Sequence, residues 1–411
     1  MGIELTSEQM DLKDKCVDFY RHYGRDKQYF YYSGAAGTGK TTVMRYIMDY
    51  LHIKEDEFIA CAYTGKAVLN LLRHGLNAST IHSLIYRPEF KTVKETVIDE
   101  FGNPKEYKKK KMTFTLKSEL PKNLKLIVVD EIGMVNDQMI QDILSFGIPV
   151  IMMGDMNQLP PVFGISSILE YPDFVLTKIM RQEEHNPIVF LSQCILKGIP
   201  LEYGTYKTSK VVSSINIDKK ILDDYNIVLC GKNKTRESLN DAIRNDVLGY
   251  PDRKPMLFDK VICRRNNWDE SINGIYLTNG LSGIITDVNY CSLYRNILYM
   301  DFKPDFLDDS FEHLSVDYKF LTADWKDKKD VPFNMEHERF EYAYAITVHL
   351  SQGSEYPSVL YMDESFHDAE TLKRLQYTAV TRAVDRITYV KSEQRKVYQY
   401  HYNGFNYNID N

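Results

Sequence analysis

The chain has 411 residues, of which 44% are hydrophobic and 26% charged, and its formal net charge is −6. One hydrophobic core rarely grows to this length, so we expect two or three domains rather than a single small one. The ordinary composition excludes a wholly disordered chain. The acidic total excludes a histone-like binder, although it is compatible with a local basic groove.

Neither a secretion signal nor a membrane span is indicated. The first ten residues lack the charged start and apolar run of a signal peptide, and no apolar stretch approaches the roughly 18 residues that cross a bilayer. The six cysteines are scattered without a CxxC pair, which predicts neither a zinc site nor a disulfide framework. We therefore expect a cytosolic protein without a membrane partner.

Short apolar runs alternate with helical patterns in the first half of the chain, which is typical of a parallel sheet with crossover helices. A helix is predicted over 41–51, where apolar residues recur at helical spacing. Each predicted strand ends in a polar or glycine-containing loop, where the ligands of open α/β sheets bind. The predicted strands of this half are 29–32, 58–62, 126–129 and 149–153.

The sequence GAAGTGKT follows the first of these strands and opens the helix, which is the context of a P-loop. Backbone N–H groups and the helix N-terminus cradle phosphates there, Lys40 reaches the outer phosphates, and Thr41 coordinates Mg²⁺. ATP and Mg²⁺ are the expected cofactors. The predicted nucleotide-binding residues in this segment are Gly34, Ala35, Ala36, Gly37, Thr38, Gly39, Lys40, Thr41 and Thr42.

The apolar run IVVDE, residues 127–131, supplies the acidic partners of the P-loop. Asp130 is predicted to hold the magnesium ion, and Glu131 beside it to act as the base for the attacking water. A P-loop alone also fits a kinase or a GTPase switch, so the function depends on motifs further along the chain.

Two segments interrupt the α/β pattern. In the first, 84–122, the runs 92–99 and 111–116 flank Phe101-Gly102-Asn103-Pro104, which predicts a β-hairpin with its turn at the tip. Eight lysines crowd the stretch 105–125, which includes the second run, and they indicate either a strand-holding surface or simply a solvated face. The second interruption, 263–333, predicts a small antiparallel β module.

The second half returns to the α/β pattern, with predicted strands 227–230, 343–348, 359–362 and 387–390. The expected fold class is therefore α/β, with two parallel-sheet domains that each carry a β insertion. The expected domains are 1–175, which contains the hairpin segment, a second domain formed by 176–262 and 334–411, and the 263–333 module.

Three later motifs complete the series: GDMNQLPPV (154–162), LTKIMRQ (176–182) and YTAVTRA (377–383). Arg382, in the last of these motifs, lies some 340 residues beyond Lys40. An arginine there makes chemical sense as an arginine finger, which reaches the γ-phosphate from the second domain and stabilises its charge. A small-molecule kinase would leave the second-domain motifs unexplained.

With LTSEQ (5–9), AYTGKA (62–67), TIHS (80–83) and VHLSQGSE (348–355), the series resembles superfamily 1 helicases, and within them the RecD-like and Dda-like branch that moves 5′ to 3′. The resemblance implies that Gln9 contacts adenine, that Gln158 couples the γ-phosphate to DNA, and that Arg181 and Arg382 are the fingers. It also implies DNA contacts by Thr64, Lys66, Thr80, His82, Thr347, His349 and Ser351.

The same resemblance implies that both parallel sheets are RecA-like, that the hairpin is a strand-separating pin with Phe101 at its tip, and that 263–333 is SH3-like. Three positions depart from the family pattern: Tyr63 replaces the usual proline, Gly133 a serine, and Leu350 a lysine. For His82 and His349, a packed polar role remains an alternative to strand contact.

The function expected from these motifs is an ATP-dependent DNA helicase that translocates 5′ to 3′ on single-stranded DNA and unwinds duplex DNA. Two alternatives stay open: a translocase with little processive unwinding, and a binding module in which ATP only switches affinity. The expected partners are single-stranded DNA and a duplex fork, with replication or repair proteins as candidates. We expect a monomer, in the host cytoplasm if the chain is phage-encoded.

Overall fold

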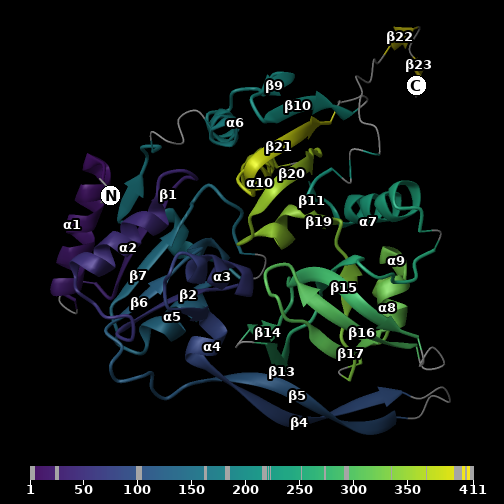
Figure 1. Cartoon of the computed structure of the whole chain (residues 1–411), viewed down its shortest axis with the longest axis horizontal. Helices are drawn as coiled ribbons and strands as arrows, with labels where there is room; N and C mark the ends of the chain where they lie inside the picture. The colour runs from purple at the N-terminus through teal and green to yellow at the C-terminus, as the bar shows by residue number, and fades with distance from the viewer. Residues whose placement is uncertain are drawn as a thin grey trace.

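The structure, a computed structural model, describes residues 5–23, 27–98, 104–161, 164–180, 186–214, 220, 222, 224–250, 252–272, 275–290, 296–334, 336–366, 368–392, 400–402 and 405–407. Two six-stranded sheets and one five-stranded sheet form its body. Figure 1 shows the first sheet on the left and the other two, one above the other, on the right.

The first sheet has the strand order β3-β2-β6-β7-β1-β8, and all its neighbouring strands are parallel. The middle strands β6 and β7 are buried along their whole length, as expected for a parallel sheet covered on both faces. The strands are β1 (Tyr29–Gly34), β2 (Phe58–Ala62), β3 (Ala78–Thr80), β6 (Leu126–Val129), β7 (Val150–Gly154) and β8 (Phe174–Leu176).

Helices cover both faces of this sheet. α1, α2 and α3 share one core with it, and α4 and α5 share another on the opposite face. Alternate residues of a strand feed the two cores; Tyr32 of β1 packs in the first and Tyr31 in the second. The helices are α1 (Ser7–Arg21), α2 (Lys40–Tyr50), α3 (Gly65–Arg73), α4 (Ile81–Ile85) and α5 (Asp137–Leu144).

The second sheet has the order β19-β11-β20-β21-β10-β9 and is parallel except for the edge strand β9. α6 and α10 pack on one face, and the end of α7 with the π-helical turn η5 packs on the other. Its elements are α6 (Pro187–Leu196), β9 (Gly204–Tyr206), β10 (Ser209–Ser213), β11 (Ile227–Cys230), α7 (Asn233–Ala242), η5 (Ile243–Val247), β19 (Ala345–Thr347), β20 (Tyr356–Met362), α10 (Ala369–Val380) and β21 (Ala383–Lys391). The prediction of two parallel α/β sheets is confirmed.

The third sheet is antiparallel, with the order β17-β16-β15-β12-β18 and a core of its own. It begins at residue 260 and ends at residue 342, so it extends beyond the predicted 263–333 by three residues at one end and nine at the other. Its elements are β12 (Lys260–Cys263), β15 (Ser282–Asn289), β16 (Ile297–Pro304), β17 (Phe311–Asp317) and β18 (Phe340–Tyr342), with helices α8 (Tyr318–Thr322) and α9 (Trp325–Lys328) and the two-stranded ribbon β13 (Asn267–Ile272) and β14 (Ile275–Leu277) beside them.

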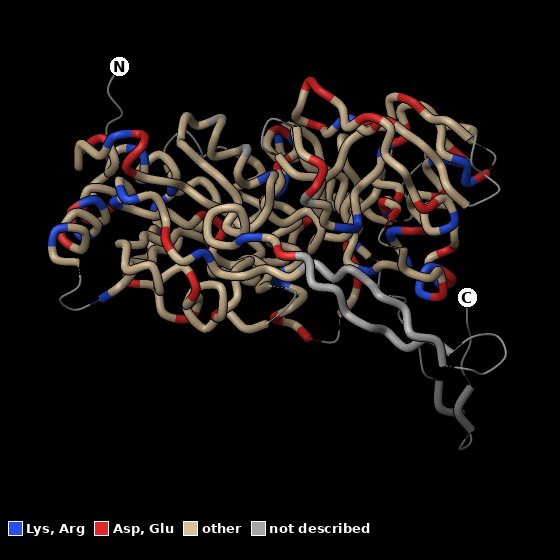
Figure 2. The backbone as a smooth tube through the Cα atoms, turned by 90° about the horizontal axis from the view of Figure 1, so that it is seen from below, with Lys and Arg blue, Asp and Glu red and all other residues tan. Residues whose placement is uncertain are grey.

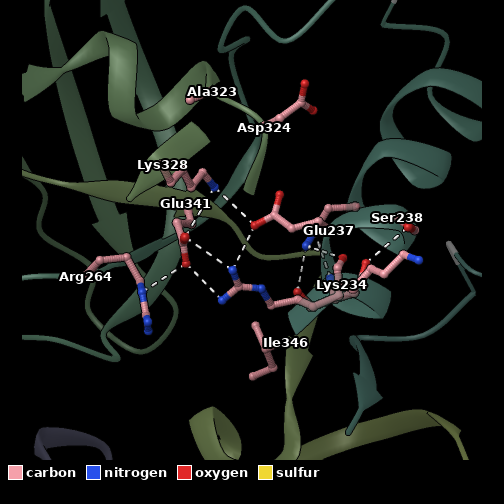
Figure 3. A network of polar contacts seen from close by, with 12 residues as sticks. Lys234, Glu237, Ser238, Arg264, Ala323, Asp324, Lys328, Glu341 and Ile346 are labelled. Atoms are coloured by element: carbon pink, nitrogen blue, oxygen red, sulfur yellow. Dashed lines mark hydrogen bonds and ion pairs between the residues drawn. The ribbon is translucent and has the colours of Figure 1, made fainter. Parts of the chain in front are cut away.

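A buried ionic network attaches this sheet to the second parallel sheet (Figure 3). Glu341 of β18 lies 2.9 Å from both Arg236 of α7 and Arg264, which follows β12. Lys328 of α9 lies 3.1 Å from Glu237 and 3.2 Å from Glu341. Except for Arg264, each of these side chains is less than a tenth exposed. The insertion is therefore joined to the second domain by paired charges as well as by the chain.

The hairpin segment forms a long ribbon that runs along the bottom of Figure 1. β4 (Tyr86–Ile98) and β5 (Pro104–Leu116) pair antiparallel from Tyr86↔Leu116 to Ile98↔Pro104. At its base, the Lys117 ammonium donates to the carbonyls of Ser83 and Leu84 at 2.7 and 2.9 Å, which satisfies free carbonyls at the end of α4. Phe101 lies outside the described residues, and its role at the tip stays a prediction.

Acidic and basic residues are interspersed over the body of the molecule in Figure 2, consistent with the modest net charge. Among the helices that the structure describes, none combines the length and apolar character that a bilayer crossing requires.

Candidate functional site

Three sequence motifs meet at one edge of the first sheet. The strands β6, β7 and β1 are neighbours and parallel, so their carboxyl ends lie side by side. The P-loop follows β1, Asp130 follows β6, and Asp155 follows β7. Ligands of open parallel sheets bind at this edge, beyond the carboxyl ends of the strands.

The P-loop turns tightly into α2. Gly39, the residue before the helix, has φ +78°, a left-handed conformation that favours glycine. The Lys40 ammonium donates to the carbonyls of Gly34 and Ala35 at 2.7 and 3.3 Å. The positive end of α2 and the loop N–H groups provide an environment that suits phosphates.

Gln9 lies against the P-loop at the N-terminus of α1. Its side-chain oxygen accepts the backbone N–H of Thr6, and the Thr6 hydroxyl accepts the backbone N–H of Gln9, which forms a capping box. Its amide nitrogen donates to the carbonyl of Thr38 at 3.0 Å. The cap therefore fixes Gln9 beside the P-loop, and its contact with adenine stays a prediction.

Asp130 and Glu131 stand at the end of β6. Burial, followed by repulsion from Glu131, raises the pKa of Asp130 to about 7, against the lowering effect of Lys40. Glu131 has φ +50°, which is unusual for a residue other than glycine and recurs at functional sites. Two adjacent carboxylates and the Thr41 hydroxyl are hard oxygen donors that fit Mg²⁺, and a cation there would offset their repulsion.

The second domain reaches this edge through a tyrosine that the sequence analysis did not select. The hydroxyl of Tyr377, in α10, accepts the backbone N–H of Ala36 at 3.1 Å and donates to the Asp155 carboxylate at 2.5 Å. Tyr377 is completely buried. It belongs to the YTAVTRA motif, but only the arginine of that motif offered a recognisable chemistry.

A second pair of contacts holds the segment that carries Gln158. The Thr378 hydroxyl accepts the backbone N–H of Leu159 at 3.1 Å, and the Gln352 side chain donates to the Leu159 carbonyl at 2.8 Å. The Leu159 side chain also packs in the core of the second domain. The backbone next to Gln158 is thus fixed by the opposite domain.

The two predicted finger arginines have different outcomes. Arg181 lies outside the described residues. The Arg382 guanidinium is buried and donates to the carbonyls of Ser354 and Thr378 at 3.1 and 3.3 Å, within its own domain. A role at the γ-phosphate would require these bonds to be exchanged, and it stays a prediction.

Known proteins resemble this chain in both halves. Residues 16–214 match the AAA domain family, and residues 342–387 match the UvrD-like helicase C-terminal domain. The ATP-dependent RecD2 DNA helicase of Deinococcus radiodurans is 26% identical over 365 residues, which cover 86% of this chain and 46% of that protein. The ATP-dependent DNA helicase Pif1 of Campylobacter jejuni is 23% identical over 413 residues, 86% of each chain. Together these matches support the expected resemblance to RecD/Pif1-like helicases of superfamily 1.

Solved structures of Pif1 helicases share the fold. The Pif1 helicase from Bacteroides in complex with ADP-AlF3 and single-stranded DNA superposes with a TM-score of 0.51 at 18% identity, over 94% of this chain and 92% of that chain. Pif1 from Candida albicans gives 0.50 at 16% identity, over 96% and 97%. The expected resemblance to superfamily 1 helicases and the RecA-like fold are confirmed, and the chain spans about half the length of the Deinococcus relative.

Two residues of the motif AYTGKA, Thr64 and Lys66, are predicted to contact a DNA strand, and both lie at the domain junction. The Thr64 hydroxyl accepts the backbone N–H of Ala67 at the start of α3. A Cβ added to Gly353, which has φ +70°, would come within 2.7 Å of that hydroxyl, so only glycine fits there without displacing Thr64. The Lys66 ammonium donates to the hydroxyls of Ser282 and Tyr356 at 2.6 and 3.3 Å.

Lys66 therefore links the first domain to the antiparallel sheet and to β20. A cavity of about 420 Å³ lies at this triple junction. The strand contact predicted for Lys66 stays a prediction, and its ammonium would have to leave these hydroxyls to bind a phosphate.

The TIHS motif leads into the hairpin. The Thr80 hydroxyl caps α4 by accepting the N–H of Ser83 at 3.1 Å. The His82 ring lies 5.6 Å from Tyr63 and 5.4 Å from Phe114, measured between ring centroids. Burial lowers the pKa of His82, so the ring is held neutral among aromatic side chains at the hairpin base.

The VHLSQGSE motif begins with the capping residue Thr347, whose hydroxyl accepts the N–H of Leu350 at 3.4 Å. Ser351 is completely buried and donates to the Val348 carbonyl at 2.8 Å. Burial lowers the pKa of His349 as well. The hydrogen bonds of Thr347 and Ser351 lie within the motif itself. Direct contact of Thr347, His349 and Ser351 with a DNA strand stays a prediction.

Proposed function

We propose that the chain is an ATP-dependent DNA helicase that moves 5′ to 3′ on single-stranded DNA and opens duplex DNA ahead of it. The observation that carries the proposal is the meeting of the P-loop, the Asp130–Glu131 pair and the Asp155 segment under contacts from the second domain. Its relatives in Deinococcus and Campylobacter are named ATP-dependent DNA helicases.

In this proposal Lys40 leaves the carbonyls of Gly34 and Ala35 to contact the outer phosphates. Thr41 and Asp130 would hold Mg²⁺, which neutralises the charge that develops on the transferred phosphate. Glu131 accepts a proton from the attacking water, while Arg181 and Arg382 stabilise the transition state from the opposite side.

Motion along the strand follows if the two domains close on ATP and reopen after hydrolysis, because strand contacts on the two domains then tighten alternately. The motifs GDMNQLPPV and TIHS support the 5′ to 3′ direction by their resemblance to the RecD-like branch. The hairpin is the proposed separation pin. The proposed partners are single-stranded DNA and a fork, bound by a monomer that works with replication or repair proteins.

The test measures ATP hydrolysis with and without single-stranded DNA, together with unwinding of duplexes that carry a 5′ or a 3′ tail. We expect strand-stimulated hydrolysis and unwinding only with the 5′ tail. Lys40→Ala should abolish turnover, and Glu131→Gln should bind ATP without hydrolysing it.

Unwinding from a 3′ tail alone would place the chain in the opposite branch. Strand-stimulated hydrolysis without any unwinding would favour the translocase. Hydrolysis that single-stranded DNA does not stimulate would contradict the motor itself.

A further inference from the structure

The Tyr377 hydroxyl makes both of its hydrogen bonds across the domain interface. It accepts the N–H of Ala36 in the P-loop and donates to Asp155, which follows β7. The ring packs in the core of the second domain, on the helix α10. A phenylalanine would fill that core equally well, so packing does not explain the hydroxyl.

The chemistry of the hydroxyl suits this double contact. Burial raises the pKa of Tyr377 well above its usual value, and the nearby Asp155 carboxylate raises it further. The hydroxyl therefore keeps its proton and can donate to the carboxylate while its lone pair accepts from Ala36. Hydrogen bonds to charged groups are stronger than those between neutral groups.

The next residue on the helix completes the arrangement. Thr378 accepts the N–H of Leu159, so α10 holds both ends of the Asp155–Leu159 segment. Gln158 lies within that segment. Because Tyr377 and Thr378 are consecutive in one helix, any movement of α10 displaces the P-loop contact and the Gln158 segment together.

We propose, building on the ATPase activity proposed above, that Tyr377 is a positioning residue that couples closure of the second domain to the P-loop and to the segment carrying Gln158. It acts through Ala36 and Asp155 rather than on the nucleotide. The coupling should therefore affect the rate of hydrolysis in the closed protein more than the affinity for ATP.

The test compares Tyr377→Phe with Tyr361→Phe in the full chain. Tyr361 is also completely buried in the same core, but its hydroxyl donates to Asp363 within its own domain, at 3.3 Å. Both variants lose one buried hydroxyl, so differences between them report the interdomain contact. Strand-stimulated kcat, the KM for ATP and the melting temperature are measured for each variant.

For Tyr377→Phe we expect kcat to fall by about 10-fold to 100-fold, because a hydrogen bond to a charged group contributes about 1.5 to 3 kcal/mol and 1.4 kcal/mol is a factor of ten. The KM for ATP should change by less than about threefold. Tyr361→Phe should keep a kcat within about twofold of the wild type. Both variants should melt at similar temperatures.

A double-mutant cycle with Asp155→Asn locates the effect. If the hydroxyl acts through Asp155, the double variant should be no slower than the slower single variant, whereas independent effects would multiply. Multiplying effects, or equal kcat in Tyr377→Phe and Tyr361→Phe, would overturn the proposal. Absence of strand-stimulated hydrolysis in the wild type would instead contradict the proposed function.

Discussion

The second domain has two junctions of opposite character. It meets the first domain through single hydrogen bonds, most of them from the uncharged side chains of Tyr377, Thr378 and Gln352, and it shares no ion pair with that domain among those found in the described residues; Lys66 and Arg374 take part only as donors to a hydroxyl and a carbonyl. It meets the antiparallel sheet through the buried network of three cations and two carboxylates centred on Glu341 (Figure 3).

This difference matters for motion. A hydrogen bond contributes about 1 kcal/mol net between neutral groups and about 1.5 to 3 kcal/mol to a charged group such as Asp155, whereas removing one partner of a buried ion pair costs about 3 to 5 kcal/mol because the other charge stays buried. Each contact of the first junction can therefore be exchanged during a reaction cycle at a lower cost than a contact of the second. Opening the second junction would leave buried charges without partners. We therefore expect the antiparallel sheet to move with the second domain as one body.

The largest effect is expected where the charged junction is broken. Glu341→Gln leaves Arg236, Arg264 and Lys328 with only the Glu237 carboxylate, and we expect a loss of about 3 to 5 kcal/mol in the free energy of unfolding. Urea denaturation at neutral pH measures it. Glu312→Gln, an exposed residue of β17 in the same sheet, is the control and should change stability by less than about 0.5 kcal/mol. Equal stability of the two variants would mean that the network does not fasten the sheet.

At the junction with the first domain, Thr378→Val removes the acceptor of the Leu159 N–H while keeping the side-chain shape. We expect a loss of about 1 to 3 kcal/mol, the cost of leaving a buried donor without a partner. The same variant should hydrolyse ATP more slowly, since Leu159 follows Gln158. Urea denaturation and strand-stimulated turnover are measured together. A stability loss as large as that of Glu341→Gln would remove the contrast between the junctions.

The sequence alone predicted the parts of the fold whose signal is local. Strands β1, β2, β6 and β7 are short apolar runs that end in polar motifs, and the P-loop follows from the residues of one turn. The two junctions leave no such signal. Tyr377 and Ala36 are 341 positions apart, and nothing near either residue indicates the other.

Other contacts escaped prediction for the same reason. Lys66 was selected from a motif as a strand contact, but its bond to Ser282 joins helix α3 to strand β15, whose residues are 216 positions apart. Glu341 was not selected from the sequence, because its three cationic partners come from α7, α9 and the turn after β12. Only the assembled fold shows which charges are buried together.

The smallest expected effect is the pH dependence of stability, which distinguishes the charge of Glu341 from its packing in the network. Burial tends to raise the pKa of Glu341, but Lys328, Arg236 and Arg264 together outweigh it and hold the pKa below the usual value of 4.5. A carboxyl with a lowered pKa in the folded state contributes stability above its unfolded pKa and loses it as the pH falls through the folded pKa. The stability gap between the wild type and Glu341→Gln should therefore be fully present at neutral pH and should shrink below about pH 4.5.

Urea denaturation of both proteins along an acid series measures the gap, with Glu312→Gln as the control. A gap that stays constant into acid would show that Glu341 acts through its shape rather than its charge, and the contrast between the two junctions would then need another cause.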